Sequence, residues 1–93
     1  MFYVYLIVAK NSQNNLISYV GYTNNLKKRL NLHNNSRGAK FTKGKFWKLI
    51  YFKIYKTKIK ALKEEYKLKK DYKLRSNIKK KYLRNENINI ATL

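Results

Sequence analysis

The run from Phe2 to Ala9 constrains the fold most, because every residue in it is apolar or aromatic. It is rich in residues that favour β-strands, and it is far too short to cross a bilayer. A strand without a polar face must be covered on both sides. We therefore predict that this segment is the central strand of a sheet. The two-residue period of a strand divides its side chains between two faces, with Tyr3, Tyr5 and Ile7 on one and Phe2, Val4 and Leu6 on the other.

Two further strands are predicted. Lys10–Asn15 is polar and prone to turns, and the strand pattern resumes at Leu16–Val20, which predicts an antiparallel hairpin that ends at Gly21. Phe46–Tyr55 predicts a third strand. Within it, Lys48 and Lys53 fall on opposite faces, so either one end of the strand is exposed or a bulge shifts its register.

The first helix should start just after the hairpin. Thr23 or Asn24 can cap it, because a short side chain with an oxygen can accept a free amide of the first turn. The apolar positions predict a helix from Leu26 to residues 34–36. With about 100° per residue, Arg29 and His33 flank its buried edge.

Two more helices are expected in the second half. Thr57 is a suitable cap for a helix from Lys58 to about Lys70, and Asp71–Leu83 is a second helical stretch with a break expected around residues 75–76. Residues 84–93 are polar and then weakly β-prone, and we expect them to form a frayed tail.

Adjacent glutamates in the Lys58–Lys70 segment should face different ways. If the apolar face is centred on Ile59, Tyr66 lies on the same side, and Glu65 falls between Ala61 and Leu62. Glu64 falls outside that arc. We therefore expect Glu65 to point toward the sheet and Glu64 to point toward water.

Charge is the strongest compositional feature. The chain has 23 lysine and arginine residues against 4 acidic residues, a net charge of +19 with a pI of about 10.3. Such an excess on 93 residues indicates a polyanionic partner, most often nucleic acid. An AT-rich genome could raise the lysine content, but it would not explain the scarcity of acids. The candidate contacts with phosphates lie in helices and in a basic loop that holds two of the glycines, and they are Lys28, Arg37, Lys40, Lys43, Lys45 and Lys69. A solvated lysine surface is the alternative for any one of them.

The composition also limits the chemistry. The absence of cysteine excludes disulfides, thiolate nucleophiles and cysteine zinc sites, and a single histidine cannot build a histidine-rich metal site. A divalent metal would have to rest on oxygen ligands, which suits Mg²⁺ or Mn²⁺. Neither a signal peptide nor a membrane anchor is indicated, so we expect a cytoplasmic protein with no membrane partner.

Five residues should meet at one end of the sheet, and they are Tyr5, Tyr19, Arg29, His33 and Glu65. Together they supply what is needed to hydrolyse a phosphodiester with one metal. A carboxylate holds the cation, a guanidinium neutralises the charge that develops on phosphorus, and a phenol or imidazole handles the proton of the attacking water. Taken singly, each has an ordinary explanation: core tyrosines, a basic helix, a packed histidine, and a pair between Glu65 and Lys69.

The same residues resemble the GIY-YIG nuclease superfamily. Tyr3-Val4-Tyr5 stands at the first triplet and Tyr19-Val20-Gly21 at the second, and Arg29, His33 and Glu65 match the family's helical arginine, its following histidine or tyrosine, and its metal-binding glutamate. The run Gly38–Thr42, followed by Leu49–Tyr51, is similar to small stand-alone bacterial members. The resemblance extends from Tyr3 to about Lys70. Tyr3 replaces a glycine of the first triplet, and the asparagine that longer members carry beyond the glutamate has no clear counterpart.

This resemblance implies an α+β fold, with a small three-stranded antiparallel sheet flanked by helices in residues 1–83 and a tail at 84–93. It also implies a DNA endonuclease dependent on Mg²⁺ or Mn²⁺, active in DNA repair or recombination, with branched or nicked DNA as candidate substrates. Glu65 would bind the metal, Arg29 would contact the scissile phosphate, and Tyr5 or Tyr19 would deprotonate or position the water with help from His33. A tyrosine base needs a phenol pKa well below about 10, and a bound cation and Arg29 would lower it.

Two other functions remain open from the sequence. One is a basic nucleic-acid-binding module that keeps the fold but has weak or no turnover of its own. The other is a small basic protein associated with ribosomes. The sequence does not predict an oligomeric state.

Overall fold

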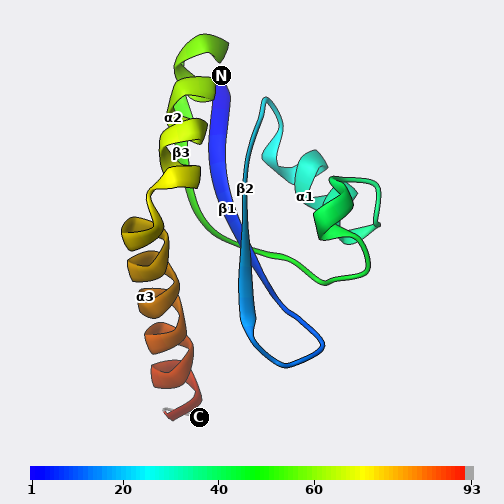
Figure 1. The fold of residues 1–93 in the computed structure, drawn as a ribbon, viewed down its shortest axis with the longest axis vertical. Coiled ribbons are helices and arrows are strands. Elements are labelled where there is room, and N and C mark those ends of the chain that lie inside the picture. The colour runs from blue at the N-terminus through cyan, green and yellow to red at the C-terminus, as the bar shows by residue number, and fades with distance from the viewer. Residues whose placement is uncertain (92–93) are drawn as a thin grey trace.

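The computed structural model describes the backbone of residues 1–91 and the side chains of residues 1–85. Its strands are β1 (Phe2–Lys10), β2 (Leu16–Thr23) and β3 (Lys48–Tyr55), which form one antiparallel sheet in the order β2-β1-β3. The helices form two layers, with α1 (Leu26–Asn34) and a short 3₁₀ helix η1 (Lys40–Thr42) on one face and α2 (Lys58–Lys70) and α3 (Tyr72–Ala91) on the other (Figure 1). The predicted α+β fold is confirmed.

The central position of β1 follows from its apolar sequence. Val4 and Leu6 pack with Ala61 and Leu68 under α2, whereas Tyr5 and Ile7 pack with Trp47 and the apolar side of α1. All four β1 side chains are at most 2% exposed. The predicted division of β1 between two faces is therefore confirmed, and each face has its own hydrophobic core.

A bulge in β3 resolves the conflict between its two lysines. Leu6 pairs with Tyr51 and Ile7 pairs with Leu49, so Ile50 is the extra residue. The shift brings Lys48 and Lys53 to the same side of the strand. Because the side chain of Asn34 holds the backbone of Trp47 by two hydrogen bonds of 2.6 and 3.1 Å, β3 begins at Lys48 and not at Phe46.

Helix α1 starts at Leu26 as predicted, but its capping residue differs from the prediction by one or two positions. Asn25 is the cap, and its Oδ1 accepts the amide of Lys28 at 3.1 Å. Thr23 acts one step earlier, since its hydroxyl accepts the amide of Asn25 at 3.1 Å. Two short polar side chains in a row thus turn the chain from β2 into α1, and the predicted cap at Thr23 or Asn24 is wrong.

The second half contains the two predicted helices with a different break. Thr57 caps α2 as predicted, by accepting the amide of Lys60 at 3.2 Å. The helices separate at Asp71, whose Oδ1 accepts the amide of Leu74, and not around residues 75–76. Arg75 instead ties the two helices together by donating to the carbonyls of Leu68 and Lys69.

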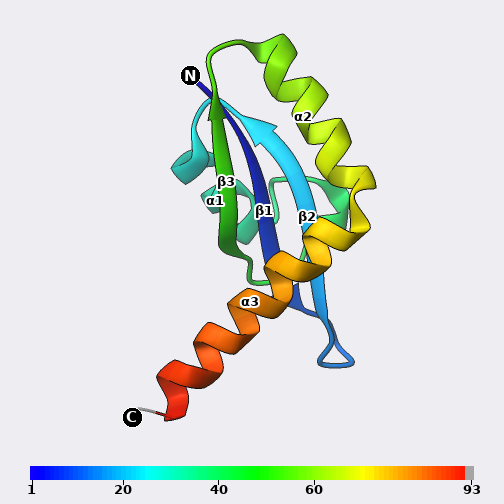
Figure 2. The same cartoon turned by 90° about the vertical axis from the view of Figure 1, so that its left-hand side faces the viewer.

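Helix α3 crosses the sheet and extends past the edge at β3 (Figure 2). It continues to Ala91, beyond the predicted end at Leu83. The division into a domain of residues 1–83 and a tail of residues 84–93 stays a prediction, and residues 92–93 lie outside the described part. Among the described residues, no helix combines the length and apolar character that crossing a membrane would require.

Candidate active site

The candidate site is centred on the phenol of Tyr5, on the face of the sheet that α1 covers. The Tyr5 Oη lies 2.8 Å from Nε2 of His33, and Nε of Arg29 donates to the same oxygen over a long 3.5 Å. Arg29 and His33 are four residues apart on α1, so their side chains leave the same side of the helix. Two polar groups of one helix thus meet on a single oxygen atom of the neighbouring strand.

Gly21 makes room for this phenol. It pairs with Tyr5 across β1 and β2. A Cβ at Gly21 would lie 2.3 Å from the Tyr5 Oη and 2.5 Å from its Cζ. The glycine is therefore required by the close approach of the Tyr5 ring to the backbone of β2.

Tyr19 approaches the same imidazole from the neighbouring strand. Its ring meets that of His33 edge to face, with 5.3 Å between centroids, and stacks on Phe41 at 6.1 Å. Tyr19 is half-buried, whereas His33 is fully buried. Both tyrosines therefore lie against His33, but only Tyr5 is hydrogen-bonded to it.

Thr42 was not among the predicted site residues. The basic loop that holds Gly38 and Gly44 was predicted to contact phosphates, yet Thr42 within it is fully buried. Its Oγ1 lies 2.8 Å from Nδ1 of His33. Gly38 matters for the same histidine, because a Cβ there would lie 2.3 Å from Nδ1. The run Gly38–Thr42 stood out in the sequence as a local motif, but no spacing rule predicted that it contacts His33.

Burial and the charge of Arg29 decide the ionisation of the site. Burial raises the pKa of Tyr5, and the hydrogen bond and charge of Arg29 lower it by less. The bond to Tyr5 is the main reason that the pKa of Arg29 is raised. Burial, followed by the charge of Arg29, lowers the pKa of His33 to about 4. His33 is therefore neutral near pH 7, and Arg29 alone does not give Tyr5 the low pKa expected for a base.

Glu65 comes from α2, in the helical layer on the other face of the sheet. Its side chain is only 16% exposed and forms an ion pair with Lys69 at 3.7 Å. Within residues 1–85 it has no hydrogen bond to the four groups on the α1 face. Its charge is nevertheless one of the causes that raise the pKa of Tyr5, after burial and the effects of Arg29 and Tyr19. The structure thus brings four of the five predicted residues into contact, and holds the fifth in the opposite layer.

The buried face of α2 differs from the prediction. Ile59 and Tyr66, which were expected to face the core, are 70% and 59% exposed, whereas Ala61 and Leu68 are buried. Glutamates 64 and 65 flank this buried face from its two sides. The prediction that Glu64 points to water is therefore wrong.

Glu64 is held among lysines. Its side chain is 23% exposed and pairs with Lys60 at 3.1 Å and Lys67 at 3.5 Å. The hydrogen bond with Lys60 is the main reason that its pKa is lowered. Glu64 and Glu65 are therefore two half-buried carboxylates of one helix, and the charge of Glu65 is one of the causes that raise the pKa of Tyr5.

The donors at the site limit the kind of metal that it could hold. Among the described residues, no group of three or more histidine, cysteine or acidic side chains is arranged around a common point. Glu65 offers one half-buried carboxylate. That donor set fits Mg²⁺, which keeps several waters and binds through one or two carboxylates and substrate phosphates.

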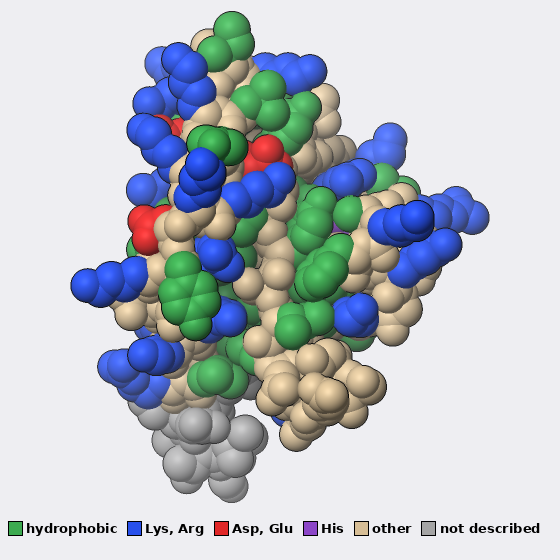
Figure 3. Space-filling view, viewed as in Figure 1, with side chains coloured by type: hydrophobic (Ala, Val, Ile, Leu, Met, Phe, Trp, Pro, Cys, Tyr) green, Lys and Arg blue, Asp and Glu red, His purple; other side chains and the backbone are tan. Residues whose placement is uncertain are grey.

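The predicted nucleic-acid contacts lie on both helical layers. Lys28 and Arg37 line an open groove along α1 together with Lys27 and several asparagines, and Lys40 and Lys43 are exposed on the following loop. Lys45 lies 5.6 Å from the centre of the Phe41 ring, and Lys69 pairs with Glu65. In the space-filling view, lysine and arginine side chains gather over α2 and α3 on one side and around α1 on the other (Figure 3).

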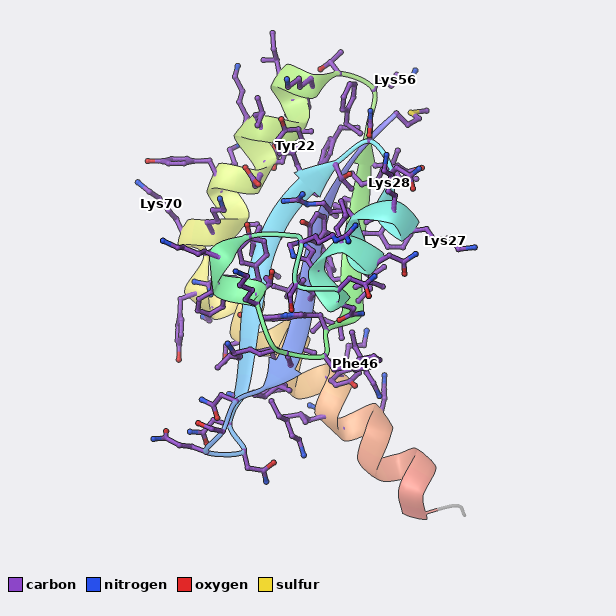
Figure 4. The ribbon with its side chains drawn as sticks, turned by 90° about the vertical axis from the view of Figure 1, so that its right-hand side faces the viewer. Tyr22, Lys27, Lys28, Phe46, Lys56 and Lys70 are labelled. Carbon is purple, nitrogen blue, oxygen red and sulfur yellow. The ribbon has the colours of Figure 1, made fainter. Side chains whose placement is uncertain are left out.

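These two basic areas are separated by the sheet. Lys27 and Lys28 project from α1, whereas Lys70 projects from α2 on the other side of β2 (Figure 4). Apolar side chains lie between the two areas in Figure 3.

The family model of the GIY-YIG catalytic domain matches residues 1–85. The chain belongs to the GIY-YIG family. This GIY-YIG domain is 44% identical to a UPF0213 protein of Clostridium perfringens over 71 residues, which are 75% of this chain and 72% of that protein. It is 38% identical to a UPF0213 protein of Oceanobacillus iheyensis over 68 residues, 72% of this chain and 74% of that one.

A further relative is UPF0213 protein YazA of Bacillus subtilis, 45% identical over 53 residues that are 56% of this chain and 54% of that protein. No solved structure matches the chain. GIY-YIG domains point in general to nuclease activity, a nucleic-acid substrate and a divalent metal.

Proposed function

We propose that this GIY-YIG domain is a DNA endonuclease, dependent on Mg²⁺ or Mn²⁺, that acts in DNA repair or recombination. The observation that carries the proposal is the meeting of Arg29 and His33 on the phenol oxygen of Tyr5. A structural tyrosine needs one hydrogen-bond partner. A phenol that shares its oxygen between a guanidinium and a neutral imidazole is arranged for proton transfer beside an anion.

Each residue would have a distinct task. Arg29 neutralises the charge that develops on the scissile phosphate. Tyr5 accepts a hydrogen bond from the attacking water, and His33 takes up the proton that the phenol releases. Glu65 would hold the divalent metal, which when bound supplies positive charge to the reacting phosphate. The positive charge of the bound metal would lower the pKa of Tyr5, which burial raises.

The charge of the domain supports a long polyanion as substrate. A net charge of +19 with exposed Lys28, Arg37 and Lys40 around α1 and its following loop favours binding to a phosphate backbone. We expect the domain to bind DNA with little sequence preference, and its affinity to fall steeply as the salt concentration rises. Branched, nicked and plain duplexes all belong in the assay, because no feature of residues 1–85 selects among them.

The test is cleavage of labelled branched, flapped, nicked and plain duplex DNA, and of matched RNA, with Mg²⁺ or Mn²⁺ or with excess EDTA. Tyr5→Phe removes the phenol oxygen, and Tyr22→Phe is the matched control because Tyr22 packs against the other core (Figure 4). We expect Tyr5→Phe to lower the rate by about 10²- to 10⁴-fold and Tyr22→Phe to keep it.

Cleavage that survives in EDTA, or that is equal in the two variants, would count against the proposal. Salt-dependent binding without any product, from wild type and variants alike, would favour the binding module without turnover. A preference for RNA over every DNA substrate would remove the assignment to DNA repair.

A further inference from the structure

The buried hydroxyl of Thr42 has a hydrogen-bond arrangement that determines which nitrogen of His33 carries the proton. Its Oγ1 lies 2.8 Å from the carbonyl oxygen of Ala39 and 2.8 Å from Nδ1 of His33. A carbonyl oxygen can only accept, and two oxygens at this distance repel each other unless a hydrogen lies between them. The single hydrogen of the hydroxyl therefore points to Ala39.

The remaining hydrogens then have only one arrangement. With its hydrogen engaged, Thr42 can only accept from His33, so Nδ1 must carry a hydrogen. A neutral imidazole has just one N–H, and its other nitrogen, Nε2, is left as an acceptor. The contact of 2.8 Å between Nε2 and Tyr5 Oη must then use the phenolic hydrogen.

We propose that Thr42 is a positioning residue that holds His33 as the Nδ1–H tautomer and thereby makes Tyr5, and not Tyr19, the residue that accepts a proton from the attacking water. This inference rests on the proposed nuclease function and deepens it. Tyr19 touches the same imidazole through its ring and has no such hydrogen bond to it.

The consequence for Tyr5 follows from counting its hydrogen-bonding capacity. Its hydrogen goes to His33, and one oxygen lone pair receives Nε–H of Arg29. One lone pair remains, and it can only accept, which is what a base needs in order to bind a water. In the opposite tautomer, His33 would donate to Tyr5, and the phenol would present its hydrogen to the substrate.

The proton transfer balances without any other reactant. One O–H bond of the water breaks and a new bond forms at the Tyr5 oxygen, while the original phenolic hydrogen moves to Nε2 of His33. The hydroxide that remains attacks phosphorus as the bond from phosphorus to the leaving sugar oxygen breaks, and that oxygen takes a proton from solvent water. The proton from the attacking water is held on an imidazolium whose Nδ1–H still donates to Thr42. Arg29 disfavours that imidazolium, and an anionic phosphate bound to Arg29 would offset this effect.

The surrounding structure holds the side chains of Tyr5, His33 and Thr42 in place. Trp47, itself buried, donates its indole N–H to the carbonyl of Thr42 at 2.9 Å. Gly38 leaves space against Nδ1 that a side chain would fill. Among the described residues, no buried polar side-chain atom lacks a partner, so the chain from Tyr5 to Ala39 is complete.

The test uses the fact that His33 is the only histidine of the chain. Two-bond ¹H–¹⁵N correlation spectra of the intact protein at neutral pH contain the signals of a single imidazole ring. The chemical shifts of its two nitrogens identify the tautomer, and this measurement does not require enzymatic activity. We expect a protonated Nδ1 in the wild type and in Thr42→Ser, and a protonated Nε2 in Thr42→Val, which has no acceptor for Nδ1–H. A protonated Nε2 in the wild type would overturn the proposal, whether or not the variants fold.

The kinetic arm separates this inference from the proposed function. Thr42→Val should lower the single-turnover cleavage rate by about 10²- to 10⁴-fold with DNA affinity unchanged, and Thr42→Ser should restore it. An unchanged tautomer and rate in Thr42→Val would refute the role of Thr42 but leave the nuclease intact. If the predicted tautomers are seen in a protein that cleaves no substrate, the role of Thr42 in setting the His33 tautomer is supported and the proposed nuclease function is contradicted.

Discussion

Replacing Gly21 with alanine perturbs the site without removing any of its polar groups. The added Cβ would lie 2.3 Å from the Tyr5 hydroxyl oxygen, whereas ordinary contacts begin at 3.4 Å, so the phenol must move by about 1 Å. The ring is 2% exposed and packed beside Ile7 and Trp47, which prevents it from turning toward solvent. The displacement must therefore be taken up at the hydroxyl, where the bond to His33 is 2.8 Å long.

A misplacement of about 1 Å costs on the order of 10²-fold in rate, and overpacking of a core costs about 1–3 kcal/mol in stability. Single-turnover cleavage and urea unfolding measure the two effects separately. Gly44→Asn is the matched control. Gly44 has a φ of +74° and no atom within 4 Å of an added Cβ, and asparagine tolerates that conformation. We expect this control to stay within about twofold of the wild-type rate.

A second comparison isolates the hydroxyl. In a Tyr5→Phe background, Gly21→Ala should cause no further loss of rate, because the oxygen that it displaces is already absent. A folded Gly21→Ala protein that cleaves at the wild-type rate would refute the reasoning. The reasoning would also be refuted if Gly21→Ala lowered the rate by the same factor in the Tyr5→Phe background as in the wild type.

Other predictions concern stability and binding. Thr57→Ala removes the cap of α2 and should lower the free energy of unfolding by about 1 kcal/mol in urea, with DNA affinity unchanged. The pKa of His33 is about 4 in the fold against an ordinary 6.5, so the unfolded chain binds more protons between these values. The stability that neutral His33 contributes is complete above pH 6.5 and is lost as the pH falls to 4, by about 3 kcal/mol relative to His33→Gln. Parallel stability curves for the two proteins would contradict this. Arg29→Lys keeps the charge but loses the planar fork, and single-turnover cleavage should fall while salt-dependent binding persists.

Strand periodicity predicted the part of the fold that depends on local pattern. The uninterrupted apolar run of β1 indicated a covered central strand. The two lysines of β3 indicated either an exposed strand end or a bulge, and the structure shows a bulge at Ile50. The face of α2 could not be derived in this way. Ile59 is apolar but lies in the first turn, where it is exposed, and the small Ala61 is what allows α2 to approach the sheet.

The contacts of the site could be predicted where two residues lie on the same helix or are paired on neighbouring strands. Arg29 and His33 are one helical turn apart, and Tyr5 and Gly21 are paired strand positions, so their proximity follows from secondary structure. Thr42 was missed because its contact with His33 depends on how an irregular loop folds back over α1. No periodicity encodes such a closure. The function of the loop was predicted from its positive charge, whereas its buried side chain, that of Thr42, is neutral.

The most direct test of the central claim compares Glu65→Gln with Glu64→Gln. The claim is that a carboxylate of α2 completes a hydrolytic centre whose other groups lie on the α1 face, and the two glutamates are adjacent, half-buried and paired with lysines. Single-turnover DNA cleavage is measured across a range of Mg²⁺ concentrations. We predict a loss on the order of 10²-fold or more for Glu65→Gln and a rate near wild type for Glu64→Gln. Equal rates for the two variants, or a larger loss for Glu64→Gln, would contradict the account.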